Sequence, residues 1–145
     1  MKRALPSLAE TDRQTQAVTR WRQVGIGVVF AWFLLGGLAH FAFTATEMRI
    51  VPPWIPWPRM VVLASGACEL LGAAGLLWRR SRPAAGIGLF LLTLAVTPAH
   101  FYMLRQPELF DVPYWALVLR LPVQAALLVL IAWSTWRWKP AVGAG

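Results

Sequence analysis

Cysteine is almost absent from this sequence. Cys68 is the single cysteine among 145 residues, and it lies inside an apolar run. One cysteine excludes an intramolecular disulfide, a C-x-x-C redox pair and a cysteine-rich metal site. Its apolar surroundings disfavour a reactive thiolate, so we interpret Cys68 as a small buried residue.

Charged residues are also scarce, at 14% of the sequence, whereas 58% of the residues are hydrophobic. Soluble domains usually carry about a quarter charged residues. The apolar excess therefore predicts contact with a lipid bilayer. The sequence contains no G-x-S-x-G or P-loop motif, which are signatures of nucleophilic and nucleotide-dependent enzymes. We expect no catalytic residues and no independent catalytic activity.

The sequence contains several long apolar stretches. A helix of about 20 apolar residues crosses the hydrocarbon core, and four stretches reach that length without the strict alternation of a β-barrel. The predicted spans are residues 21–43, 59–78, 84–104 and 114–136, inside one membrane domain at 21–138. The first run is too long and begins too late for a signal peptide. The sequence thus predicts an all-α, polytopic membrane four-helix bundle.

Two short tails flank this domain, at residues 1–20 and 139–145. Ser7 and Glu10 have the spacing of a capping box, which would open a short helix in the first tail. The alternative is a disordered tail. The last residues, 140–145, are expected to be a frayed end.

Basic residues are distributed unevenly between the two sides of the predicted bundle. One side carries Lys2, Arg3, Arg13, Arg20, Arg22, Arg79, Arg80, Arg82, Arg137 and Lys139, and the other carries Arg49, Arg59 and Arg105. Because cytoplasmic flanks are rich in Lys and Arg, both chain ends are predicted to be cytoplasmic, an N-in/C-in topology. A basic flank beside anionic lipid also accounts for most of the net charge of +8 without a nucleic-acid partner.

Two patterns recur in the same order along the chain. Ala39–Phe41 returns as Ala99–Phe101 at an offset of 60 residues, and Glu47–Trp54 returns in part as Glu108–Trp115 at an offset of 61. The order is helix, outer connection, helix, repeated once. We interpret this as a parallel repeat of two helix pairs about an axis along the membrane normal.

Five polar residues lie inside the predicted spans: His40, Glu69, His100, Arg120 and Gln124. Ionisable residues within a membrane are rare and mark functional sites by default. At about 1.5 Å per helical residue, all five fall between the outer surface and the midplane. Every span contributes at least one, so we predict that they line a ligand-binding pocket open toward the outer face.

Two interpretations of this cluster stay open. In the first, Glu69 and Arg120 pair inside the pocket, with His40 and His100 at its mouth. In the second, the Glu69–Arg120 pair is purely structural and the histidines make interhelical hydrogen bonds. Pro98 cannot donate its backbone nitrogen, so we expect a kink near His100.

Metal and haem binding receive little support from these residues. Two histidines on two helices meet the minimum for bis-histidine haem ligation, but no further feature favours it. A single Glu is a poor third ligand for zinc. We therefore predict no metal site, and we regard haem as disfavoured.

The residues described so far resemble the DoxX-like family of small bacterial membrane proteins over residues 24–136. The resemblance is carried by Gly37–Phe41, Ile50–Pro56, Ser65–Gly72, Pro98–His100 and Leu119–Gln124. It implies a four-helix membrane bundle in a bacterial inner (plasma) membrane. The family takes its name from a subunit of a thiosulfate:quinone oxidoreductase, and similar proteins are associated with redox and thiol-stress systems.

Three functions remain open at this point. The first is a membrane subunit or partner of a redox system, with quinone as the ligand of the polar pocket and a membrane-associated oxidoreductase as the partner. The second is a small transporter or lipid-binding protein, which would need a homodimer to form a pathway. The third is a structural membrane partner with no ligand of its own.

Overall fold

The structure, a computed structural model, describes residues 8–136, with side chains from residue 16 onward. The elements are α1 (Leu8–Ala42), α2 (Thr44–Met48), α3 (Pro58–Leu77), α4 (Arg82–Ala95), α5 (Thr97–Arg105), the 3-10 helix η1 (Pro107–Leu109) and α6 (Tyr114–Thr135). No strand occurs within the described range. The all-α prediction is therefore confirmed for this part of the chain.

Four helical segments within residues 8–136 are long and apolar enough to cross a membrane. They are Gln16–Ala42, Pro58–Leu77, Arg82–Arg105 and Tyr114–Thr135. Seven of the eight predicted span boundaries lie within two residues of the ends of these segments. These helices indicate an integral membrane protein, because each has the length and the composition of a membrane span.

The first helix begins earlier than its predicted span. α1 extends without interruption from Leu8 to Ala42, so residues 8–20 continue the span as helix. Ser7 of the proposed capping box lies outside the described residues, as does the C-terminal tail.

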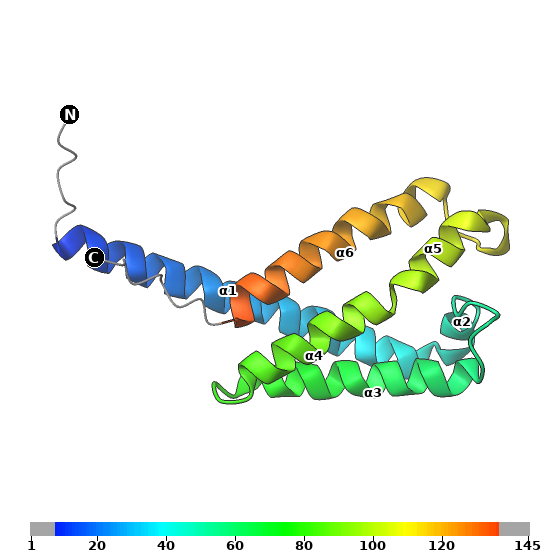
Figure 1. Cartoon of the computed structure of the whole chain (residues 1–145), viewed down its shortest axis with the longest axis horizontal. Coiled ribbons are helices and arrows are strands. Elements are labelled where there is room, and N and C mark those ends of the chain that lie inside the picture. The colour runs from blue at the N-terminus through cyan, green and yellow to red at the C-terminus, as the bar shows by residue number, and fades with distance from the viewer. Residues whose placement is uncertain (1–7, 137–145) are drawn as a thin grey trace, which may run out of the picture.

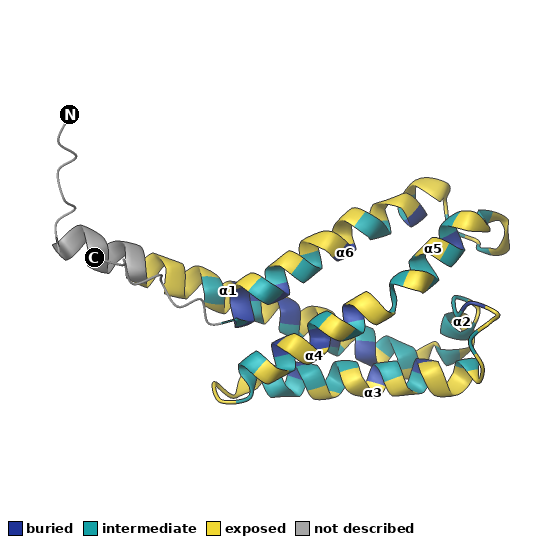
Figure 2. Cartoon of the chain, viewed as in Figure 1, coloured by how far each residue is buried: buried dark blue, intermediate teal, exposed yellow. Residues whose placement is uncertain are grey.

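Exposed residues occupy much of the outer faces of the helices, as the colours of Figure 2 show, and many of them are large and apolar. Leu35, Leu71 and Val129 are each about two-thirds exposed or more in the middle of a span. Cys68 is also exposed, so the prediction of a buried cysteine was wrong. Successive helical residues are about 100° apart, and Cys68 therefore faces outward although Glu69 beside it lines a cavity.

The packed core occupies one half of the bundle. Its fully or almost fully buried members are Val29, Phe33, Ala73, Leu76, Leu89 and Ile131. They come from the end of the bundle that holds the α3–α4 turn and the end of α6 (Figure 1). Gly86 lets α4 approach α6 there, because a β-carbon at this position would overlap Thr135. Small residues permit such close crossings of membrane helices.

Arginine side chains close two helix ends at the same end of the bundle. Arg22 donates to the backbone oxygens of Ser134, at 3.4 Å, and of Trp136. Arg82 Nε donates to the Leu76 oxygen at 2.7 Å. The last carbonyls of a helix have no partner within the helix, and a cation near them is favourable. These basic residues thus cap α6 and α3.

The third span is broken in the middle. α4 ends at Ala95 and α5 begins at Thr97. Pro98 is in the first turn of α5, where its missing N–H cannot bond back to the preceding turn. The predicted kink is confirmed and lies at Val96. Figure 1 shows α5 and the start of α6 diverging from α1 and α3 beyond this break.

Candidate functional site

A cavity of about 460 Å³ adjoins the core and is lined by residues from all four spans and from the connection between the first two. Its polar lining residues are His40, Glu47, Ser65, Glu69, Thr93, His100, Arg120 and Gln124. The rest of the lining is mostly apolar, with Trp32, Phe33, Leu92 and Leu127 among its members. All five residues predicted from the sequence therefore lie around one cavity. Their role in binding a ligand stays a prediction.

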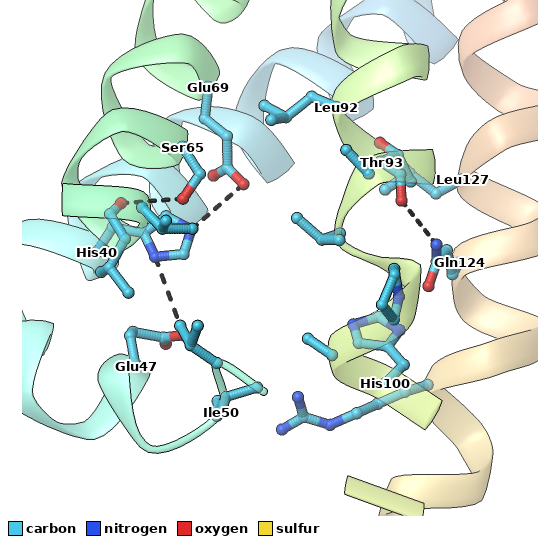
Figure 3. A pocket seen from close by; sticks show the side chains of 18 of the residues that line it. His40, Glu47, Ile50, Ser65, Glu69, Leu92, Thr93, His100, Gln124 and Leu127 are labelled. Atoms are coloured by element: carbon cyan, nitrogen blue, oxygen red, sulfur yellow. Dashed lines mark hydrogen bonds and ion pairs between the residues drawn. The ribbon is translucent and has the colours of Figure 1, made fainter. Parts of the chain in front are cut away.

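One wall of the cavity is built from α1, α2 and α3. His40 lies between two carboxylates, with Nε2 3.4 Å from Glu69 Oε1 and Nδ1 3.9 Å from Glu47 Oε2. Figure 3 shows the imidazole between the two acidic side chains. The second distance is too long for a hydrogen bond, and Nδ1 is buried without a hydrogen-bond partner among the described residues.

Two glycines make room for this arrangement. A β-carbon on Gly36 would lie 2.7 Å from Glu69 Oε2, and one on Gly66 would lie 2.7 Å from the His40 β-carbon. Each glycine is on the helix opposite the polar residue that it accommodates. The contact between His40 and Glu69 therefore depends on a close crossing of α1 and α3.

The opposite wall is built from α4, α5 and α6. Gln124 Nε2 donates to the Thr93 backbone oxygen at 2.7 Å and contacts Thr97 Oγ1 at 2.6 Å. A carbonyl oxygen can only accept, so the amide nitrogen must face Thr93 and Oε1 must face away. Gln124 is only 7% exposed, and its Oε1 has no hydrogen-bond partner within the described part of the chain. The interaction ties α6 to both sides of the break in the third span.

Arg120 and His100 complete the second wall. Arg120 Nη1 lies 3.6 Å from the sulfur of Met103, which is a weak acceptor. The predicted pair between Arg120 and Glu69 does not form among the described residues, where the ion-pair contacts of Glu69 go to His40. The reason is geometric, because the α5–α6 arm diverges from α3 (Figure 1) while His40 is adjacent on α1.

Glu47 was missed as a site residue by sequence reasoning. It belongs to the short helix α2 in the connection between the first two spans, outside every predicted span. The same connection contributes Ile50, Val51, Pro52 and Ile55 to the cavity lining. A signal was present in the sequence, because Glu47 opens one of the two recurring patterns and lies only seven residues after His40.

The connection between the first two spans contacts α5 and the connection between the last two spans. Trp54 packs edge-on against Tyr102 with ring centroids 5.9 Å apart, and Tyr102 packs in the same way against Phe110 at 6.0 Å. Arg49 Nη2 lies 3.5 Å from the Leu109 oxygen. These contacts link the connection after α2 to α5 and to the connection before α6, at one end of the cavity.

The two walls differ in charge. One carries Glu47 and Glu69 with His40 between them, and the other carries Arg120 with His100. Such a cavity can hold a polar group that meets a hydrogen-bond acceptor on one side and a cationic donor on the other. No group of three His, Cys, Asp or Glu residues in the described part of the chain could hold a metal ion.

The fold and the cavity define a class of protein, an integral membrane protein of four long apolar helices with a polar-lined cavity. A family model described as "Domain of unknown function (DUF8561)" matches residues 29–136. The chain belongs to this family. No curated protein and no solved structure matches the chain.

Proposed function

We propose that the protein binds the polar head of an amphipathic ligand in this cavity, as a membrane component of a quinone-linked redox system. The observation that carries the proposal is the convergence of His40, Glu69, His100, Arg120 and Gln124 on one largely apolar cavity. Ligand sites are typically apolar clefts with a few convergent polar groups. A quinone head has this character, since a flat ring carries oxygens at its two ends.

Unsatisfied polar groups favour a ligand over a purely structural cluster. Gln124 Oε1 and the Nδ1 atoms of His40 and His100 are buried without hydrogen-bond partners among the described residues. An unpaired polar group costs free energy when it is buried. Among the described residues, the one hydrogen-bond contact of the Arg120 guanidinium is with the Met103 sulfur, which leaves donors for a ligand oxygen.

The partner and the setting follow from the resemblance to the DoxX-like family. It suggests a bacterial inner membrane and a membrane-associated oxidoreductase as the partner. We further propose an N-in/C-in topology, in which the end capped by Arg22 and Arg82 is cytoplasmic. The helix order, with a short helical turn in each outer connection, supports the interpretation as two copies of a helix pair.

Binding of a short-chain ubiquinone to the full-length protein in nanodiscs tests the proposal. Trp32 lines the cavity, so ligand binding is expected to quench tryptophan fluorescence. Arg120→Gln is expected to weaken binding about tenfold, since a hydrogen bond from a charged donor is lost. Arg105→Gln is the matched control, because Arg105 is exposed and does not line the cavity. Absence of binding, or wild-type affinity in both Arg120→Ala and Glu69→Ala, would refute the proposal.

A small transporter or lipid-binding protein is the second candidate function. It is favoured by the divergence of the α5–α6 arm from α1 and α3 (Figure 1), together with polar residues at mid-depth in the spans. Flux of a labelled phospholipid across proteoliposomes would support it. Ubiquinone binding without any lipid flux would favour the redox function.

A further inference from the structure

We propose that Glu69, His40 and Glu47 form a proton relay that links the cavity to the first outer connection. The proposal rests on the proposed function, because a relay needs a ligand with an acidic proton in the cavity. It adds a second activity, proton exchange between that ligand and the outer side of the bundle. The three side chains come from α3, α1 and α2, and they are contiguous in space.

The order of the three groups carries the inference. A carboxylate in the cavity contacts one nitrogen of an imidazole at 3.4 Å, and a second carboxylate lies 3.9 Å from the other nitrogen. The side chains of Glu69, His40 and Glu47 are 13%, 18% and 29% exposed, so exposure rises steadily from the cavity toward the connection. An imidazole can accept a proton at one nitrogen and release one from the other.

Two glycines position the side chains of the relay. Gly36 of α1 leaves room for the Glu69 carboxylate, and Gly66 of α3 leaves room for the β-carbon of His40. The buried Nδ1 of His40 lacks a hydrogen bond among the described residues. A rotation of the Glu47 side chain would shorten the 3.9 Å gap to hydrogen-bond distance. Such a rotation satisfies the nitrogen and completes the path.

Each proton movement balances without any electron transfer. A ligand hydroxyl loses its proton to the Glu69 carboxylate and becomes an oxyanion. Glu69 then passes a proton to His40 Nε2, and His40 releases one from Nδ1 to Glu47, which leaves the ring neutral in its other tautomer. Glu47 gives the proton to water at the outer connection.

The other charged groups around the cavity suit this direction of transfer. His40 faces Glu47 from α2 and Glu69 from α3, and across the cavity are His100 from α5 and Arg120 from α6. A guanidinium stays protonated in proteins and cannot take part in the relay. It supplies instead a fixed positive charge for the ligand oxyanion.

An alkyl-substituted 4-nitrophenol provides a probe that needs no redox step. It is a single-ring amphiphile whose hydroxyl and oxyanion forms differ in absorbance. The full-length protein in nanodiscs, with the probe bound, is subjected to a rapid pH jump, and the rate of probe deprotonation is recorded. Equilibrium affinity is measured separately for every variant.

Three variants separate the relay from a structural role. His40→Gln and Glu47→Gln keep polar side chains of similar size but cannot transfer protons. At probe concentrations that saturate each variant, we expect deprotonation of the bound probe to slow about tenfold or more. Glu108→Gln is the matched control, because Glu108 is exposed in the other outer connection and does not line the cavity. It is expected to behave as wild type.

The outcomes are distinct. Slow exchange in both relay variants and wild-type exchange in Glu108→Gln support the relay. Wild-type exchange in His40→Gln and Glu47→Gln, or equal slowing in Glu108→Gln, overturns the relay and leaves the proposed ligand binding intact. If the wild-type protein binds neither the nitrophenol nor ubiquinone, the proposed function fails and the relay fails with it. Glu47→Gln gives a result even if His40→Gln does not fold, since Glu47 lies outside the spans.

Discussion

Gly36 of α1 faces the Glu69 carboxylate of α3 so closely that a β-carbon at position 36 would lie 2.7 Å from Oε2. The carboxylate is thereby held between the backbone of α1 and the ring of His40. A polar group from one span thus fits into a space left by a glycine on another. The position of Glu69 is determined by this helix crossing.

Gly36→Ala is expected to change the site more than the fold. The added methyl meets the end of a flexible side chain, so the carboxylate moves away and the helices stay in place. We expect ubiquinone affinity to fall several-fold while stability changes by about 1 kcal/mol or less. Gly27→Ala is the control on the same helix, because no atom lies within 4 Å of a β-carbon there. Equal affinity in the two variants would contradict the prediction.

Gly66→Ala is expected to destabilise the bundle itself. Its β-carbon would lie 2.7 Å from the β-carbon of His40, an atom fixed to the backbone of α1. The two helices must therefore separate, at a cost of about 1–3 kcal/mol. The free energy of unfolding in mixed detergent micelles measures this. A stability equal to that of Gly27→Ala would show that α1 and α3 do not cross this closely.

Gln124→Leu is expected to destabilise the helical turns on both sides of the break in the third span. The substitution removes the interactions with the Thr93 oxygen and Thr97 Oγ1, each of which is worth about 0.6–2 kcal/mol in a membrane. Faster hydrogen exchange in α5 and in the last turn of α4 is the measurement. Ala125→Leu places the same side chain at the neighbouring exposed position and should leave exchange unchanged. Protection of α5 in the Gln124 variant would show that Gln124 does not hold the break.

Arg22→Gln is expected to fray the end of α6. The guanidinium donates to the Ser134 and Trp136 oxygens, and a charge at a helix C-terminus contributes about 0.3–1 kcal/mol. Hydrogen exchange should rise in the last turn of α6 and stay constant elsewhere. Arg20→Gln removes the same charge from an exposed position two residues earlier. Identical exchange in both variants would rule out the cap.

Cys68 provides a chemical test of the membrane assignment. The residue is exposed in the middle of α3, so in a bilayer it faces lipid. An apolar maleimide is expected to label it in vesicles much faster than a charged one, and solubilisation in detergent should narrow the difference. Mass spectrometry of the intact protein reports the labelled fraction. Rapid labelling of intact vesicles by the charged reagent would place this face of α3 in water.

The spans could be predicted well because lipid imposes a length and a composition on any helix that crosses it. The capping-box spacing of Ser7 and Glu10 offered a helix in the first tail as one alternative, but its continuity with the first span was not predicted, because hydropathy has no signal where a helix continues into a polar stretch. Helical rise alone predicted that the five site residues lie at similar heights in the bundle, and all five line one cavity. Their partners did not, since Glu69 and Arg120 have similar depth and the rotation and tilt of each helix decide which groups meet.

Cys68 and Glu47 show that a local sequence pattern does not determine which side chains are buried or meet one another. An apolar stretch around a cysteine indicates burial in a soluble protein, whereas in a membrane span it is equally compatible with lipid exposure. Glu47 lies in a connection, and only the folding of α2 against α3 brings it beside His40. The sequence places Glu47 close to His40 along the chain, but the packing of α2 decides that its carboxylate faces the imidazole.

The break at Val96 has a consequence for how this family can vary. The buried core lies on one side of the break, whereas the cavity is lined from both sides of it, by Thr93 of α4 and His100 of α5 among others. The width of the cavity therefore depends on this joint and on the short arm beyond it. Substitutions around Val96 and Pro98 can therefore resize the cavity without disturbing the residues that hold the bundle together. Related chains could accept ligands of different size on the same scaffold.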